Sequence, residues 1–348
     1  MDLDTISDIR ESFQNVTFSN FQKSKTKNEL LNCIYKAKIE NANYWTAELV
    51  CSGHYLDLWD VIILYSTRYI HCGNPKLFPY LELRYNQFIT ILKNGYTSTP
   101  IMLRNNSKIR KLFCEVITIL CYSVKKHNYS KIKIDKCEDF DLININKKFK
   151  ANNTEIINNI YKEDDPKDLM LPFNELIHAL TSKNIVDACF WYEWIVEYSN
   201  KCKKNKKKCE CESRIYAPNG NQKDVIWIVW DILFYFSEKR EELIKKIINS
   251  LFVLFKIQFS SSCKTKRKYV LYFAFSLLIE KIDFTINICS CTDDVNKVCE
   301  KINNVYREIK KNEISPKTDY LFDNVKQKNV EKSMQKMEIF NSMTDDIS

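Results

Sequence analysis

The chain has 348 residues, a formal net charge of +9 and only four glycines, at positions 53, 73, 95 and 220. So few glycines exclude a glycine-rich loop that cradles nucleotide phosphates, and the motifs of zinc proteases, serine hydrolases and dinucleotide-binding folds are also missing. The length predicts two or three domains, and the basic charge is compatible with contact to nucleic acid.

Fourteen cysteines are scattered along the chain, and the N-terminal residues are polar and acidic rather than a secretory signal. The apolar runs are too short or too interrupted to span a membrane. We therefore expect a soluble intracellular protein with reduced, buried thiols and no cofactor. Two groups of three cysteines leave a metal site open as an alternative, although neither has paired C-x-x-C spacing: Cys202, Cys209 and Cys211, and Cys289, Cys291 and Cys299.

Residues 1–26 read as an N-terminal arm with a short helix, and a repeated stretch follows it. Residues 27–50 and 173–196 are similar at one constant offset. In both, Asn-Glu-Leu precedes an Ala-x-aromatic-Trp motif, a Trp-Asp pair comes later, and apolar residues recur at helical spacing. This predicts an all-α fold with an internal duplication. We expect the matching aromatic residues in the core: Tyr44, Trp45 and Trp59 in one copy, and Phe190, Trp191 and Trp230 in the other.

We expect Asn28 and Asn174 to cap the first helix of each copy, and Ser182 or Asn184 to cap the second helix of the later copy. The first helical unit covers residues 27–127. Its last predicted helix has cations at both ends. Cations at the start of a helix oppose its dipole, so these are candidate phosphate contacts: Arg104, Lys108, Arg110 and Lys111.

Residues 128–168 read as a linker, residues 169–311 as the second helical unit and residues 312–348 as a mobile tail. A cation-rich loop follows the second Trp helix, and a second cationic turn spans 260–268. Such a loop is a solvated surface feature in many proteins, and in a basic protein it is also a candidate DNA contact. Its candidate residues are Lys201, Lys203, Lys204, Lys206, Lys207 and Lys208.

The first copy carries Ala42, Tyr44, Trp45 and Gly53, followed by a Gly-Asn-Pro stop at 73–75. This spacing resembles the helical collar that follows the ATPase module in clamp-loader-related AAA+ proteins, especially replication ATPases of the Werner-helicase-interacting type. The alanine is one residue closer to the tyrosine than in that family, the expected paired arginines are absent, and the chain has no ATPase module. Several short strings are also similar to proteins of large nucleocytoplasmic DNA viruses of the mimivirus kind.

The resemblance implies a non-catalytic, clamp-loader-like accessory subunit of viral DNA replication. Its partners would be a sliding clamp or ATPase clamp-loader subunits, together with DNA and without a membrane. The protein would then act in the host cytoplasm, in a viral factory or in the nucleus. The alternative is a structural or assembly protein of a virion, whose basic loops meet packaged nucleic acid or an acidic partner. A third hypothesis is an enzyme whose catalytic residues are distant from one another in the sequence.

Overall fold

The computed structural model describes residues 4–93 and 100–314. Within these ranges the regular secondary structure is helical, with no strand and one isolated bridge between Val16 and Gln22. This confirms the predicted all-α fold. Across the same ranges, no helix combines the length and the apolar character that crossing a bilayer requires.

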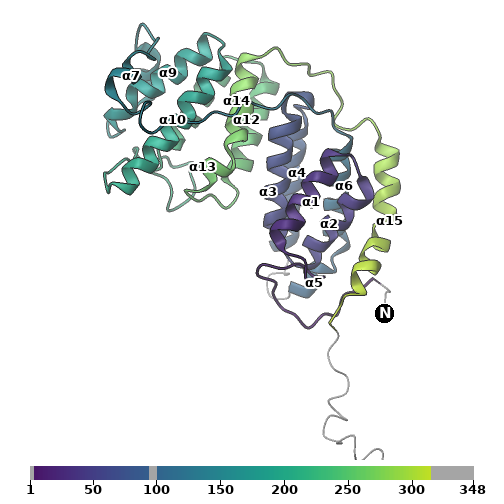
Figure 1. The fold of residues 1–348 in the computed structure, drawn as a ribbon. Coiled ribbons are helices and arrows are strands. Elements are labelled where there is room, and N and C mark those ends of the chain that lie inside the picture. The colour runs from purple at the N-terminus through teal and green to yellow at the C-terminus, as the bar shows by residue number, and fades with distance from the viewer. Residues whose placement is uncertain (1–3, 94–99, 315–348) are drawn as a thin grey trace, which may run out of the picture.

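The chain forms two helical halves that meet at an angle (Figure 1). The first half contains α1 (Lys23–Tyr35), α2 (Ile39–Cys51), α3 (Tyr55–Tyr65), the π-helical turn η1 (Ser66–Ile70), α4 (Leu77–Lys93), α5 (Pro100–Arg104) and α6 (Ser107–Tyr122). The second contains α7 (Leu142–Asn146), α8 (Glu155–Ile160), α9 (Met170–Thr181), α10 (Ile185–Lys204), α11 (Ile226–Ser237), α12 (Glu242–Lys256), α13 (Cys263–Lys266) and α14 (Lys268–Ile279). Helix α4 packs on α12, and α14 lies against α3 and η1, so these helices join the halves.

The two similar segments form the helical hairpins α1–α2 and α9–α10. Ala37 and Lys183 occupy corresponding positions in the two turns, and both have a left-handed backbone, with φ of 52° and 58°. The Ala37 amide donates to Ile34 O at 3.1 Å, and the Lys183 amide donates to Leu180 O at 3.4 Å. A left-handed residue just after the last helical turn satisfies carbonyls that the helix end leaves open.

The helix that opens each hairpin begins earlier than the sequence indicates. Helix α1 starts at Lys23 and α9 at Met170, so Asn28 and Asn174 lie inside these helices and are not their caps. The side-chain amide (Nδ2) of Asn174 instead donates to the backbone carbonyl of Asn153 at 2.8 Å. Predicted capping fails here because each helix extends for at least one turn before its asparagine, and neither N-cap residue makes a side-chain capping bond.

Five helix–helix contacts in the first half have counterparts in the second half. In the first half α1 contacts α2, α3 and α6, and α6 contacts α2 and α4. In the second half α9 contacts α10, α11 and α14, and α14 contacts α10 and α12. The order of these helices along the chain is the same in both halves.

Three of the predicted core aromatics are buried, namely Trp59, Trp191 and Trp230. The other three, Tyr44, Trp45 and Phe190, are only partly buried and pack against the core from its edge.

The two tryptophans of the repeated motif have similar neighbours but differ in exposure. Phe21 contacts the Trp45 ring edge-on with centroids 5.3 Å apart, whereas Phe149 stacks on Trp191 at 5.5 Å. Trp191 is therefore buried in the core as expected, whereas Trp45 is only partly buried, so the two tryptophans do not occupy equivalent buried sites. A stacked ring covers more of the indole than an edge-on ring does.

Residues 128–168 are not a free linker, because they cover the second half. Trp194 Nε1 donates to the Asp139 carbonyl at 2.7 Å, and the Phe140 ring lies 5.2 Å from the Trp194 ring. The backbone amides of Lys150 and Ala151 both donate to the Glu175 carboxylate at 2.9 Å. The asparagine-rich composition of this segment suggested a linker. The segment is nevertheless held on the second half by its few buried apolar residues and by these hydrogen bonds of its backbone.

The last described helix, α15 (Thr292–Lys310), returns to the first half and packs on α6 and α2 (Figure 1). The assignment of residues 293–311 to the second unit is therefore wrong. Val295, Ile302 and Ile309 form a buried stripe at seven-residue spacing, which matches the open face of α2 and α6. Nearly all of the tail predicted over 312–348 lies outside the described residues.

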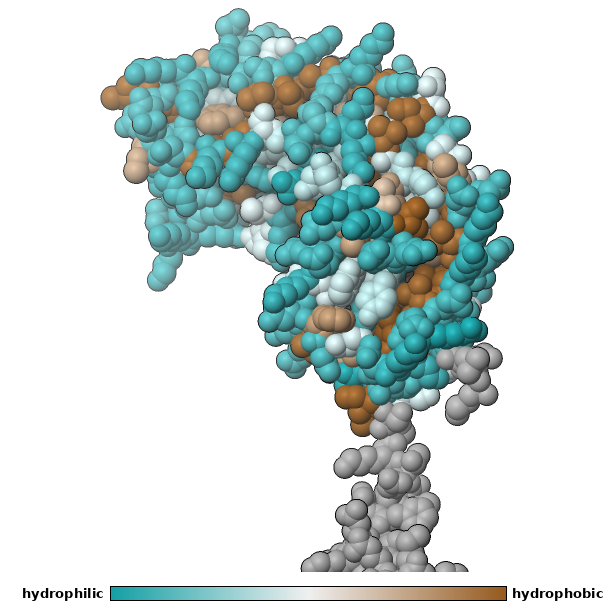
Figure 2. Space-filling view, turned by 45° about the vertical axis from the view of Figure 1, so that its right-hand side comes forward, coloured by the Kyte–Doolittle hydropathy of each residue, from teal (hydrophilic) through white to brown (hydrophobic). Residues whose placement is uncertain are grey.

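A groove of about 520 Å³ remains open between α2 and α15. Its walls include Tyr44, Val298, Ile302 and Val305. Hydrophobic surface is visible on this side of the molecule in Figure 2.

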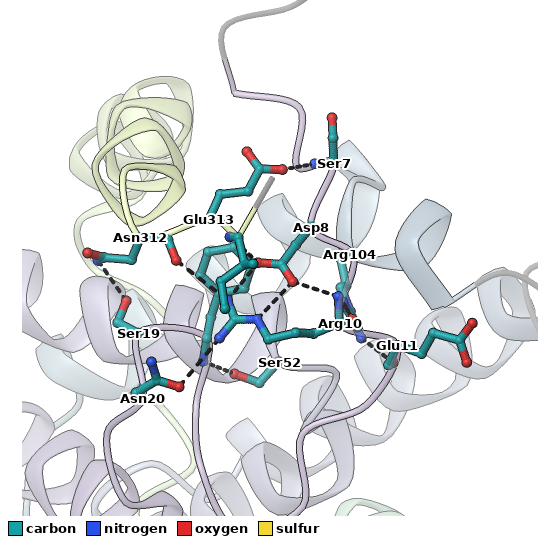
Figure 3. A network of polar contacts seen from close by, with 12 residues as sticks. Ser7, Asp8, Arg10, Glu11, Ser19, Asn20, Ser52, Arg104, Asn312 and Glu313 are labelled. Atoms are coloured by element: carbon teal, nitrogen blue, oxygen red, sulfur yellow. Dashed lines mark hydrogen bonds and ion pairs between the residues drawn. The ribbon is translucent and has the colours of Figure 1, made fainter. Parts of the chain in front are cut away.

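The N-terminal arm has no helix between residues 4 and 22, and it fastens α15 to the first half. Asp8 accepts hydrogen bonds from the Arg10 side chain and from the Ile314 amide, the latter at 2.8 Å (Figure 3). Phe13 and Phe18 are buried beneath the same segment. The arm is therefore an integral part of the first half.

Candidate nucleic-acid interface

Helix α10 extends to Lys204, so the first lysines of the cation-rich segment belong to a helical turn and not to a loop. The helix stops where Lys206 takes a left-handed backbone (φ 56°) and the Lys207 amide donates to the Cys202 carbonyl at 2.9 Å. Cations in the last turn of a helix complement its dipole. This favourable placement partly explains why the lysines gather at this end.

The exposed lysines of this segment differ in what they touch. Lys207 pairs with Asp168 at 2.5 Å, and this hydrogen bond raises the pKa of Lys207 above its usual range. Lys201 Nζ lies 4.5 Å from the Phe140 ring centroid. In the part of the chain that the structure describes, three lysines project into solvent without an ion pair, hydrogen bond or cation–π contact of the side chain: Lys204, Lys206 and Lys208.

The second cationic turn meets the first. Lys203 Nζ donates to Ser261 Oγ, and the Tyr192 hydroxyl donates to the Lys264 carbonyl at 2.8 Å. Lys264 itself is buried and pairs with Asp224 at 2.9 Å, so only its neighbour Lys266 adds an exposed charge. Figure 1 shows α13 and the end of α10 on the same edge of the second half.

Arg214 ends the cation-rich segment, but its side chain lies in the interior. Its guanidinium donates to Asp165 at 2.7 and 2.8 Å and to Asp231 at 2.8 Å. Burial by itself lowers the pKa of Arg214, but the hydrogen bonds to the two carboxylates outweigh burial and raise it. The group stays charged and anchors the loop to α11 and to the segment before α9.

Two of the four cations predicted to contact phosphate are internal, namely Arg104 at the end of α5 and Arg110 in α6. Arg104 is 2 % exposed and donates to the carbonyls of Arg10 and Glu11, at 2.9 and 2.6 Å (Figure 3). Arg110 is 3 % exposed, pairs with Asp4 at 3.0 Å and lies over the Tyr306 ring. Their donors are directed at the N-terminal arm, so neither residue is available to a phosphate.

Lys108 and Lys111 remain on the surface at the start of α6, which Asn106 caps by accepting from the Lys108 amide at 2.9 Å. Figure 1 places α6 in the first half and the end of α10 in the second half. The two predicted groups of cations therefore do not form one surface, and the α10 group is the larger.

The cysteine clusters do not assemble a metal site. Across residues 4–93 and 100–314, no group of three or more His, Cys, Asp or Glu side chains is arranged to hold a metal ion. Burial, followed by the neighbouring Cys202, raises the pKa of Cys209 to about 12. Cys299 instead contacts Cys114 of α6, with the sulfurs 3.7 Å apart.

Sequence reasoning located the cationic segments but did not separate surface cations from internal ones. Most internal cations pair with an acid that is distant along the chain: Asp165 and Asp231 for Arg214, Asp224 for Lys264, Asp60 for Arg267 and Asp4 for Arg110. Arg104 instead bonds to backbone carbonyls of the N-terminal arm. Such pairings connect residues that are far apart in sequence, so spacing alone does not reveal them.

Comparison of the chain with protein-family models, with curated proteins and with solved structures gives no significant match. The functional argument therefore depends on the geometry of the molecule itself.

Proposed function

We propose that the protein is a non-catalytic nucleic-acid-binding subunit that holds the phosphate backbone of duplex or primer-template DNA at the end of α10. The observation that carries this proposal is the meeting of two cationic segments at one edge, with Lys203 bonded to Ser261 and Lys266 nearby. Backbone contact by lysines gives binding without sequence preference.

The anchoring of this surface supports the proposal. The internal pairs of Arg214 and Lys264 fix the polypeptide on both sides of the exposed lysines. The exposed lysines therefore extend from a fixed backbone. Because the backbone is already ordered, less conformational entropy is lost when these lysines bind a phosphate.

We further propose that the two halves derive from one duplicated unit and that the first half is related to a clamp-loader collar. The equivalent turns at Ala37 and Lys183 and the matching helix pairs support the duplication. At two positions of the collar-like motif, the backbone geometry favours glycine over any residue with a side chain. Gly53 has a φ of +74°, and a Cβ at Gly73 would lie 2.5 Å from the Val124 carbonyl oxygen. In this proposal the protein is an accessory subunit of viral DNA replication, and its partners are a sliding clamp or clamp-loader ATPases.

Fluorescence anisotropy with a labelled primer-template tests the DNA surface. Replacing Lys203, Lys204, Lys206 and Lys208 by Gln should weaken binding to all sequences alike. If three of them contact phosphates, the log–log salt slope should become shallower by about 2.7, at about 0.9 for each contact. Lys207 is kept, because it pairs with Asp168.

A variant with Lys108→Gln and Lys111→Gln is the matched control, because it removes exposed lysines from α6. It should retain the affinity and the salt slope of the parent. Equal affinity and slope in the parent and the four-lysine variant would refute the proposed surface. Binding to an acidic virion protein, without binding to DNA, would support the structural or assembly role instead.

A further inference from the structure

A row of aromatic rings and cations crosses the junction between the two halves. Lys125 Nζ lies 5.4 Å from the Tyr35 ring centroid, and the Tyr35 ring lies 5.4 Å from that of Tyr69. The Arg68 guanidinium carbon is 5.1 Å from the Tyr69 ring and 5.1 Å from the Tyr269 ring. We call these five residues the tyrosine row.

The tyrosine row is accessible and positively charged. Tyr35 is 50 % exposed, and the other four members are partly buried. Neither Arg68 nor Lys125 has a carboxylate partner within residues 4–93 and 100–314. Glu193, which pairs with the adjacent Lys268 at 2.7 Å, lies beside the Tyr269 end.

The members of the row come from separate parts of the chain. Tyr35 ends α1, Arg68 and Tyr69 belong to η1, Lys125 follows α6, and Tyr269 is in the first turn of α14. η1 is a π-helical turn, and such turns are rare and frequently lie at functional sites. Four members belong to the first half and Tyr269 to the second, so the complete row requires both halves.

We propose that the tyrosine row binds single-stranded nucleic acid. Aromatic rings provide stacking platforms for bases of any sequence, and cations between the rings face the phosphates that connect those bases. Simple attraction to an acidic protein would use the cations but would give the rings no role. This surface is different from the α10 lysines, so the inference does not depend on the proposed duplex contact.

The test compares two substitutions at one position in the full chain. Tyr35→Phe keeps the ring, whereas Tyr35→Ala removes it. Since the side chain is half exposed at the end of α1, both variants should fold, which circular dichroism and thermal unfolding verify. Affinity for a labelled oligothymidylate of about 16 nucleotides is measured by anisotropy at low and at high salt.

Tyr35→Phe should bind like the parent, and Tyr35→Ala should bind about 5- to 150-fold more weakly, which is the range expected for the loss of one base stack. This difference should persist at high salt, because stacking releases no counterions. Arg68→Gln should weaken binding and flatten the salt slope by about 0.7 or less.

Equal affinities of Tyr35→Ala and Tyr35→Phe would overturn the inference, and so would a difference that disappears at high salt. The four-lysine variant of α10 separates this result from the duplex proposal. If that variant keeps its single-strand affinity while Tyr35→Ala loses it, the tyrosine row acts as an independent site. Binding of the parent to polyglutamate but not to oligothymidylate would reassign the row to an acidic protein partner and refute the inference.

Discussion

Arg214 and Asp165 form a bidentate ion pair in the protein interior, with guanidinium nitrogens 2.8 and 2.7 Å from the two carboxylate oxygens. Both side chains are at most 1 % exposed. Asp165 precedes α9 and Arg214 lies in the segment that leads to α11. The ion pair therefore fixes the end of residues 128–168, the segment whose composition predicted a linker.

Removing one partner of this pair should be costly. We expect Arg214→Met to lower the free energy of unfolding by about 3–5 kcal/mol, because the Asp165 charge would be left buried without compensation. Urea denaturation followed by circular dichroism measures this loss. Lys208→Met is the control, since this exposed lysine has no ion pair among the described residues, and it should change stability by less than about 0.5 kcal/mol. Similar losses in both variants would contradict the burial of Arg214.

Truncation of the two motif tryptophans should have unequal effects. Trp191→Ala should cost about 3–5 kcal/mol, because it leaves a cavity in the core. Trp45→Ala should cost clearly less, because Trp45 is partly exposed and is covered edge-on by Phe21. Parallel denaturation curves of the two variants give the comparison. A larger loss for Trp45→Ala would show that the edge of the first hairpin is more tightly packed than described.

Asp8 should make stability depend on pH. Burial alone would raise the pKa of Asp8, but hydrogen bonds from Arg10 and the Ile314 amide outweigh it and lower the pKa below its usual range. A lowered pKa in the folded protein stabilises it above the unfolded value of about 3.9, and this contribution disappears as the pH falls through the folded pKa.

The parent should therefore be more stable than Asp8→Asn by a constant amount above about pH 5, and the two should converge at lower pH. Thermal unfolding between neutral and acidic pH follows this difference. As a control, Asp294→Asn on the exposed surface of α15 should show no such convergence. A difference that is independent of pH would mean that Asp8 contributes by shape and not by charge.

The contact between Cys114 and Cys299 offers a test of how α15 packs. Their sulfurs are 3.7 Å apart, and a disulfide requires about 2.05 Å, so a small adjustment suffices. Mild oxidation with a diazene such as diamide should give an intramolecular Cys114–Cys299 disulfide, detected by peptide mass spectrometry. Cys114→Ser should abolish this product, whereas Cys291→Ser should leave it intact. Oxidised parent protein that lacks this cross-link would contradict the return of α15 to α6.

The helical fold and the paired hairpins were predictable from local patterns, because apolar periodicity and turn position repeat along the chain. Asn184 caps α10 as expected by accepting from the Asp187 amide. Periodicity is a local property, so it describes such elements well.

Long-range partners were not predictable in the same way. The burial of Arg104 and Arg110 depends on carbonyls and a carboxylate of the N-terminal arm, about a hundred positions away in sequence. The position of α15 depends on an open face of α2 and α6. The tyrosine row also escaped prediction, because its members meet only when η1, α1 and α14 are assembled.

The return of α15 to the first half has a consequence for how the chain is made. Synthesis proceeds from the N-terminus, so α2 and α6 leave the ribosome long before residues 292–310 exist. Until then the apolar face that α15 covers stays open to water, and the first half is incomplete although all its other helices are present. The nascent chain therefore needs α15 to finish its first half, which makes the unfinished polypeptide the form most exposed to aggregation and to chaperones.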